Sequence, residues 1–370
     1  MNALRQAKTL LCWVLIGSLI LSSPAYALRS TQPTQTGVEE ALSTDMLLGD
    51  VHLDWVNVKP ISEYEKVSCA LCGRSNDEPI GAVRINGETF HVVRCRDDGL
   101  MWLNPQPDTE YYRQLYSEKF FNVPIGIVEK VGLQYGRREV LERRREDARL
   151  QVEEWEKEGN IIRPGKLVEI GGGAGFLSKE AQTRGWDVLN VEMSEYAADL
   201  SRKSRIPTYT GTLDEALIKG VVAENVYDIV AAYALIEHLS NPNEFLEQVR
   251  RVLKEGGVLA ARIPATPDAG PRLCLAEHVY HYTIATFTQM LSKHGFVVTH
   301  QHYSGSFGDR IGNRSDAWTF FAQKRDDLFQ QMLQVLAGLE ETRNQSQVDA
   351  LFGVPLKEVA ERLEAIRSGA

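Results

Sequence analysis

The stretch Leu167-Val168-Glu169-Ile170-Gly171-Gly172-Gly173-Ala174-Gly175-Phe176 decides the fold of this chain. It predicts an apolar strand that ends in a glycine-rich turn and leads into a helix. Glycine stands at every second position of the turn, at Gly171, Gly173 and Gly175. A residue without a Cβ lets the backbone lie directly against a nucleoside and admits positive φ before the helix. The stretch therefore predicts a nucleoside-binding loop at the end of a strand.

Details of this loop distinguish between nucleoside cofactors. A dinucleotide site requires Gly-x-Gly-x-x-Gly, so that a helix N-terminus faces a pyrophosphate. After Gly171 and Gly173 the third glycine position holds Phe176, and the frame that starts at Gly173 fails at Ser178. The acid Glu169 inside the motif also argues against NAD. The loop therefore favours S-adenosylmethionine, with Glu169 and the alternate glycines as predicted cofactor-binding residues.

The residues after the loop supply a second predicted strand with an acid at its end. A helical stretch over residues 176–184 leads to a short strand over residues 187–192. Glu192 closes this strand about 20 residues past the loop, where an acid would hold both ribose hydroxyls. The alternative for Glu192 is a solvated carboxylate at a strand end. The strand-loop-helix-strand order favours ribose binding.

Further along the chain, residues 227–234 are nearly continuous in apolar side chains after one acid. This pattern is typical of a buried strand in a parallel sheet. The segment Gly211-Thr212-Leu213-Asp214 lies just upstream of that strand. We therefore expect Leu213 and Asp214 to border the adenine of the cofactor.

Several motifs follow one another between residues 165 and 323 in an order that carries a family resemblance. After the glycine loop and Glu192 come Asp228-Ile229-Val230, Leu235-Ile236-Glu237-His238-Leu239 and Leu253-Lys254-Glu255-Gly256-Gly257. On these motifs the segment resembles a class I S-adenosylmethionine-dependent methyltransferase. The resemblance implies an α/β fold with a Rossmann-like sheet and helices on both faces. It also implies methyl transfer to a small-molecule acceptor, such as a sugar nucleotide or another metabolite.

A cysteine-bearing segment precedes these motifs. Cys69-Ala70-Leu71-Cys72-Gly73 is followed by Cys95 and then by the segment Leu115-Tyr116. The arrangement resembles the group of methyltransferases that includes sugar C-methyltransferases, which carry a small cysteine ribbon before the transferase domain. In that group a fourth cysteine stands three residues after the third, and here the position is Asp98.

The four positions of this ribbon have zinc-ligand spacing. Two Cys-x-x-Cys knuckles give zinc four ligands in a tetrahedron, and a carboxylate can replace one of them. Cys69, Cys72, Cys95 and Asp98 are therefore candidate ligands of a structural zinc ion. A ribbon that has lost its metal and is held by packing alone is the alternative, and the sequence leaves both open.

Length and charge limit the classes of partner. The 370 residues suit one large domain with a small module, and the formal net charge is −9. A nucleic-acid substrate requires a basic face, and the dense basic run at residues 137–145 is interleaved with acids. We therefore expect no nucleic-acid partner, and a solvated helix over residues 134–157 with i,i+4 ion pairs. The pattern does not fix the oligomeric state.

The N-terminus conflicts with the cofactor prediction. Arg5 and Lys8, an apolar run from Leu10 to Leu21 and then Ala25-Tyr26-Ala27 have the three parts of a secretory signal peptide. The segment indicates export, or membrane association if it is not cleaved. Because S-adenosylmethionine is made in the cytosol, the cofactor favours a cytoplasmic location, and the sequence leaves the location open. The predicted organisation is a signal-peptide-like segment at 1–27, a linker at 28–60, a zinc-ribbon-like module at 61–110, a helical linker at 111–160, the methyltransferase domain at 161–325 and C-terminal helices at 326–370.

Methyl transfer from a sulfonium is an in-line displacement, so positioning alone supplies up to roughly 7–11 kcal/mol. A base is needed only where the acceptor keeps its proton. His278 and His281 are the best candidates, because they follow a strand's end and an imidazole accepts protons near neutral pH. The resemblance favours His278 as the aligned residue. A loop histidine that caps the following helix is the alternative.

Two further residues are candidates for the same reaction. His238 follows a strand beside Glu237 and faces the cofactor cleft, where either a catalytic or an architectural role fits. Tyr233 is predicted to border the methyl-bearing sulfur or the acceptor. Ala234 stands where similar proteins often have an acid. Together with Asp98 it motivates a second hypothesis, a catalytically silent protein that binds S-adenosylmethionine or S-adenosylhomocysteine, or acts as a scaffold.

Overall fold

The computed structural model describes residues 47–51, 64–85, 88–107, 109–121, 135, 137–157, 161, 164–266, 278–307 and 315–326. The predicted signal-peptide-like segment and all but the first residue of the predicted C-terminal helices lie outside these residues. Part of the predicted linker is wrong, because β1 (Leu47–Val51) is a strand that pairs in parallel with β3. Within the described residues, no helix is long and apolar enough to cross a membrane.

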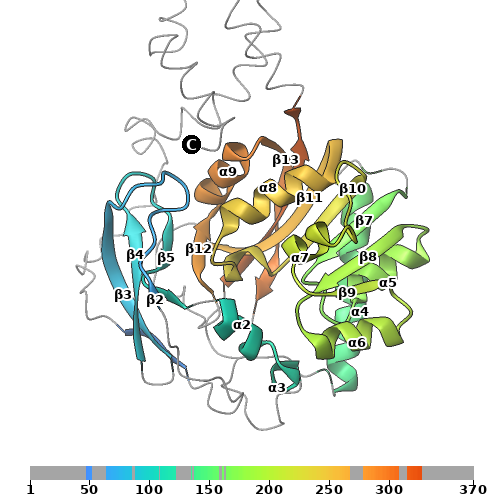
Figure 1. Ribbon diagram of the computed structural model, residues 1–370, viewed down its shortest axis with the longest axis horizontal. Coiled ribbons are helices and arrows are strands. Elements are labelled where there is room, and N and C mark those ends of the chain that lie inside the picture. The colour runs from blue at the N-terminus through green and yellow to red at the C-terminus, as the bar shows by residue number, and fades with distance from the viewer. Residues whose placement is uncertain are drawn as a thin grey trace, which may run out of the picture.

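One large sheet forms the centre of the molecule (Figure 1). From β7 onward the strands lie in the order β9-β8-β7-β10-β11, all parallel, followed by β14, which is antiparallel to β11, and by β13, which is antiparallel to β14. The chain order reverses between β7 and β10, which places a ligand-binding switch point at their carboxyl ends. The predicted α/β Rossmann-like sheet is thus confirmed. The strands are β7 (Lys166–Ile170), β8 (Asp187–Glu192), β9 (Thr208–Thr210), β10 (Tyr227–Tyr233), β11 (Leu253–Thr266), β13 (Phe296–Phe307) and β14 (Ser315–Lys324).

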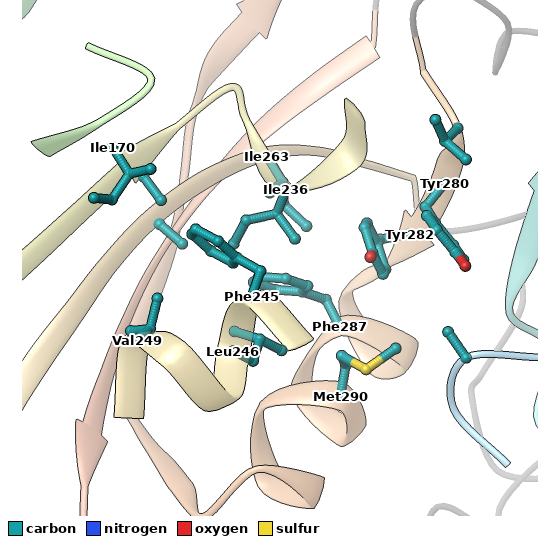
Figure 2. Packing of buried hydrophobic residues seen from close by; sticks show 14 of the residues in the cluster. Ile170, Ile236, Phe245, Leu246, Val249, Ile263, Tyr280, Tyr282, Phe287 and Met290 are labelled. Carbon is teal, nitrogen blue, oxygen red and sulfur yellow. The ribbon is translucent and has the colours of Figure 1, made fainter. Parts of the chain in front are cut away.

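Helices cover both faces of this sheet because successive side chains of its buried strands point to opposite faces. Leu167 and Ile229 belong to one apolar cluster, with side chains of α4 and α5. Val168 and Val230 belong to the other, with side chains of α8 and α9 (Figure 2). The helices are α4 (Arg138–Lys157), α5 (Phe176–Thr183), α6 (Glu195–Lys203), α7 (Leu213–Ile218), α8 (Pro242–Val252) and α9 (Ile284–Lys293), with a 3-10 turn η4 (Ile236–His238).

The charged helix α4 is more than a solvated connection. Its exposed face carries the predicted ion pairs, such as Arg138–Glu142 at 2.7 Å. Its other face buries Val152 and Trp155 completely against the sheet and α5. The described helix begins at Arg138 rather than near Gln134, and it packs as part of the transferase half.

The cysteine-bearing segment folds as a small antiparallel sheet that joins the large one (Figure 1). We call residues 66–103 the ribbon. Its last strand, β5, pairs with β12, and β12 pairs with the end of β11. The buried side chains of the ribbon lie in the same apolar cluster as those of α8 and α9. The remaining elements are β2 (Tyr64–Glu65), β3 (Asp77–Ile85), β4 (Glu88–Cys95), β5 (Met101–Leu103), β6 (Gln106–Pro107), α2 (Thr109–Leu115), α3 (Glu118–Phe121) and β12 (Tyr280–Thr283).

Candidate cofactor and acceptor site

The glycine loop lies at the carboxyl end of β7, as predicted. Gly171 continues the strand edge, since its N–H donates to the carbonyl of Val191 at 2.8 Å. Gly173 and Gly175 have φ values of 57° and 75°, which a residue with a Cβ rarely adopts. A Cβ on Gly175 would also lie 2.5 Å from Oγ of Ser201. Glycine is therefore required where the loop turns into α5.

Glu192 lies beside this loop and fixes it. One carboxylate oxygen accepts from the N–H of Gly173 at 2.7 Å, and the other accepts from the N–H of Ser194 at 2.7 Å. The carbonyl of Glu192 accepts from the N–H of Gly211 at 2.9 Å. Burial raises the pKa of the carboxyl, and these backbone donors oppose that shift. Glu192 thus joins the ends of β7, β8 and β9 where the ribose is predicted.

Glu169 binds the first turn of α5, the helix that follows the glycine loop. Its side chain is buried, and Oε2 accepts from both the backbone N–H and the hydroxyl of Ser178 in α5. Burial raises the pKa of Glu169 to about 7, and the Ser178 bonds act in the opposite direction. The geometry gives this carboxylate an anchoring role for α5. Direct cofactor contact by Glu169 stays a prediction.

The predicted adenine border follows β9 at the same edge of the sheet. Thr212 caps α7, and its capping box with Glu215 orders the turn that holds Leu213 and Asp214. Leu213 is buried, whereas Asp214 is exposed and accepts from Nε2 of Gln248 at 3.3 Å. The structure therefore places an apolar and a polar side chain beside the strand that neighbours Glu192.

Sequence analysis missed Tyr135, which covers the glycine loop. Its hydroxyl oxygen lies 3.1 Å from where a Cβ on Gly173 would be, and its ring packs near Phe121 and Phe176 at centroid distances of 5.5 and 5.6 Å. Burial raises the pKa of Tyr135, and the nearby carboxylate of Glu192 adds to this shift. No motif spacing marks this tyrosine, because it reaches the loop from outside the strand-loop-helix unit.

The predicted histidines come together as one cluster, which we call the histidine cluster. The rings of His238 and His278 lie 4.8 Å apart, and those of His278 and His281 lie 6.5 Å apart. Nδ1 of His238 is 3.0 Å from the hydroxyl of Tyr116, and its Nε2 is 3.7 Å from Oε1 of Glu237. Three separate chain segments thus meet where η4 follows β10.

The environment of this cluster favours a neutral imidazole. His278 is 7% exposed, and burial together with His238 and His281 lowers its pKa well below its ordinary value. A neutral imidazole can accept a proton at physiological pH. Ligand atoms of Glu237, His238 and His278 all lie within 4.8 Å of one another, and these are also ligand types that divalent ions accept.

Tyr233 does not join this cluster. Its hydroxyl accepts from Nε1 of Trp155 at 2.8 Å, on the face of the sheet that α4 and α5 cover. Burial raises the pKa of Tyr233 strongly, so the phenol stays protonated. The structure gives Tyr233 a packing role under α4, and its predicted contact with the acceptor is not supported by this position.

The predicted zinc ligands converge at one end of the ribbon. Sγ of Cys69 is 3.1 Å from Oδ2 of Asp98, and Sγ of Cys72 is 3.6 Å from Sγ of Cys95. All four ligand atoms lie within 4.8 Å of one another. Zinc–sulfur bonds of about 2.3 Å in a tetrahedron put neighbouring sulfurs about 3.8 Å apart. The four side chains therefore fit a zinc ion.

Comparison with known proteins finds similarity over the part of the chain that holds the glycine loop. Residues 140–301 match a family model described as a methyltransferase domain. The match begins inside α4 and ends in β13, so it includes the glycine loop, Glu192 and the histidine cluster residues of η4 and β12.

Curated relatives match a shorter part of the chain. The mitochondrial ubiquinone biosynthesis O-methyltransferase of Schizosaccharomyces pombe is 30% identical over 129 residues, which are 33% of this chain and 47% of the relative. The ubiquinone biosynthesis O-methyltransferase of Pseudomonas aeruginosa is 26% identical over 108 residues, which are 28% of this chain and 47% of the relative. The chain thus spans about half the length of these relatives.

Solved structures resemble the transferase part. A methyltransferase described as S-adenosylmethionine-dependent from Methanosarcina mazei has a TM-score of 0.39 and 16% identity, with 45% of this chain and 96% of that chain covered. The 1,6-didemethyltoxoflavin-N1-methyltransferase of Burkholderia thailandensis, solved with 1,6-didemethyltoxoflavin and S-adenosylhomocysteine, has a TM-score of 0.39 and 14% identity, with 50% of this chain and 79% of that chain covered.

Proposed function

We propose that this protein is an S-adenosylmethionine-dependent methyltransferase that acts on a small molecule. The observation that carries the proposal is the placement of Glu192 and the glycine loop at the same sheet edge as the histidine cluster. A cofactor held at the first would present its methyl group toward the second. The methyltransferase-domain match over residues 140–301 supports this assignment.

We call the glycine loop, Glu192 and the turn that begins at Gly211 the cofactor corner. These residues fit S-adenosylmethionine. Glycine allows the positive φ values of Gly173 and Gly175, which turn the loop tightly at the end of β7, where a nucleoside would lie. Glu192 would hold the ribose hydroxyls, and the turn at Leu213 and Asp214 would border the adenine. When bound, S-adenosylmethionine supplies an electrophilic methyl group on a sulfonium.

The histidine cluster supplies the base. A nitrogen of the neutral His278 imidazole would accept the proton that the acceptor loses, while bound S-adenosylmethionine would supply the methyl group. His238 orients the acceptor or His278, since its own ring is held by the Tyr116 hydroxyl and faces Glu237. Burial excludes water from His278, so its proton-accepting nitrogen is kept for the acceptor.

We further propose that the acceptor is a hydroxylated metabolite of small size, either a sugar nucleotide or a phenolic ring. The resemblance of the ribbon to sugar C-methyltransferases favours the first. The names of the curated relatives, ubiquinone biosynthesis O-methyltransferases, favour the second.

Calorimetric titration of the full chain with S-adenosylmethionine and S-adenosylhomocysteine tests the cofactor assignment. Binding of both in the micromolar range supports it, and Glu195→Ala serves as the control for Glu192→Ala, because Glu195 is exposed on the next helix. Turnover is then measured with a nucleoside-diphosphate sugar and with a catechol. Binding without turnover of any acceptor would favour the silent binding protein, for which Ala234 and Asp98 are the motivation.

We also propose that the ribbon binds one zinc ion through Cys69, Cys72, Cys95 and Asp98. Support comes from the convergence of these side chains and from the short Sγ–Sγ and Sγ–Oδ2 distances. Metal analysis of protein purified without chelators should find one zinc per chain, and Cys72→Ser should lower that content. A metal-free wild-type chain that stays folded would leave the ribbon as a packing module.

A further inference from the structure

We propose that the ribbon is a positioning element for the histidine cluster, which it holds in place through the pairing of β5 with β12. The inference rests on the proposed function, because it assigns a part in methyl transfer to a module outside the transferase sheet. It requires backbone contacts at Val279, the residue next to His278, and the structure shows those contacts.

The main chain next to His278 is bonded on two sides. The carbonyl of Val279 accepts from the N–H of Leu103 in β5 at 2.9 Å. The N–H of Val279 donates to the carbonyl of Glu237 in η4 at 2.8 Å. One residue therefore ties the ribbon to the segment of His278 and that segment to the segment of His238.

Strand pairing extends this contact to His281. Trp102 of β5 lies opposite Tyr280 of β12, and Met101 lies opposite His281. On its other side β12 pairs with β11 at Ala265 and Thr266, as far as the described residues show. The four residues of β12 thus have two register partners in the ribbon and two in β11, so the ribbon supplies half of the pairing that sets the register of β12.

Packing and side-chain bonds hold the ribbon against the transferase half. Trp102 and Tyr280 are both buried in the shared apolar cluster. At the first knuckle, the carbonyl of Ala70 accepts from Nδ2 of Asn243 at 2.8 Å and from Nζ of Lys293 at 2.9 Å. The ribbon thus contacts α8, α9 and the histidine segment together, so a displacement of the ribbon must move His278.

A proline at position 103 tests the central hydrogen bond. Leu103→Pro removes the N–H that Val279 accepts from, whereas the control Leu103→Ala loses more side-chain packing but keeps the N–H. We expect Leu103→Pro to lower kcat about 10-fold or more relative to Leu103→Ala, with S-adenosylhomocysteine affinity within about 2-fold. Equal kcat in the two variants, or affinity lost in parallel with kcat, would overturn the proposal.

A second pair of variants weakens the contact between the ribbon and α9 without changing a residue of the ribbon, and compares the result with a control. Lys293→Ala removes one donor to the Ala70 carbonyl, and Lys203→Ala, an exposed lysine at the end of α6, is its control. We expect kcat to fall by up to about 5-fold in Lys293→Ala alone, since one hydrogen bond contributes about 1 kcal/mol.

Histidine NMR separates failure of this inference from failure of the proposed function. Displacing the ribbon exposes His278 to water, so its pKa should rise toward the ordinary value in Leu103→Pro and stay low in Leu103→Ala. Glu237, His238 and His281 face His278 in both variants, so their charges do not distinguish them. The titration needs no turnover. An unchanged His278 titration in both variants sinks the positioning role even where the wild type proves inactive.

Discussion

The cofactor corner and the histidine cluster lie at the same edge of the sheet, but the chain assembles them differently. The cofactor corner comes from consecutive strand ends, Gly171–Gly175, Glu192 and Gly211, joined by backbone hydrogen bonds. The histidine cluster takes Tyr116, Glu237–His238 and His278–His281 from three distant segments and depends on β5 of the ribbon. The first is a local unit, and the second exists only in the complete fold.

The largest expected effect is on kcat and concerns the histidine cluster. His278→Ala removes the proposed base, so kcat should fall by about 10²–10⁴-fold, which is the usual contribution of a general base. The affinity for S-adenosylhomocysteine should stay within about 2-fold, because His278 is outside the cofactor corner. Steady-state kinetics and calorimetry on the same preparation measure the two effects.

His91→Ala is the matched control for this variant, since His91 is exposed on β4 of the ribbon. It should change neither kcat nor affinity. If His278→Ala keeps its turnover, His278 is an architectural residue. The histidine cluster would then not supply the base for methyl transfer.

The next effect concerns the cofactor corner, where the substitution should lower the affinity for S-adenosylhomocysteine. Glu192→Ala removes a buried carboxylate that accepts from Gly173 and Ser194 and is the proposed ribose ligand. We expect S-adenosylhomocysteine to bind roughly 100-fold more weakly, since charged hydrogen bonds contribute about 1.5–3 kcal/mol. Unchanged affinity in calorimetry would remove Glu192 from the cofactor site.

The strand, the helix and the glycine turn of the cofactor corner could be predicted from the sequence almost in full. The helix predicted at 176–184 is observed as Phe176–Thr183, and the strand predicted at 187–192 has those bounds. Glycine is needed at positions 173 and 175 because both have positive φ, and the alternate spacing of the glycines predicts this. Short sequence separation makes such units predictable, because each contact joins neighbours in the chain.

The distant site could be predicted only as separate residues. His278 and His281 were expected in a loop, but His281 lies in β12, whose partner strand is in the ribbon. Tyr116 and Tyr135 reach the two sites from segments whose sequence shows no periodicity toward them. Tyr233 points to the face of the sheet that α4 covers. Side chains alternate between the two faces along β10, so the face of Tyr233 can be assigned only once the pairing of β10 with β7 is known.

A smaller effect probes the support of the histidine cluster. Tyr116→Phe removes the hydroxyl that lies 3.0 Å from Nδ1 of His238, while the ring keeps its contact with Phe120. We expect kcat to fall about 5–10-fold with unchanged cofactor affinity, which corresponds to the loss of one hydrogen bond. A parallel loss of affinity would mean that Tyr116 supports the whole edge of the sheet and not the histidine cluster alone.

The smallest effect belongs to stability and returns to the local site. Glu169 is buried, and burial raises its pKa to about 7 from an ordinary value of 4.5. The folded state therefore binds more protons than the unfolded state between these pH values, and the stabilisation is complete below about 4.5 and lost as pH rises through about 7. Glu169→Gln keeps an oxygen for the Ser178 N–H and does not titrate.

Between pH 5 and 7.5 the free energy of unfolding should thus decrease more in the wild type than in Glu169→Gln, by about 2 kcal/mol. Denaturant unfolding at several pH values measures the difference, with Glu195→Gln as an exposed control. Glu192 also has a raised pKa and is present in both proteins, so some slope remains in the variant. Identical slopes would show that Glu169 is ionised in the folded state over this range, held by Ser178. In that case the anchor of α5 would be an ionic hydrogen bond, and the cofactor corner would carry two negative charges before any cofactor binds.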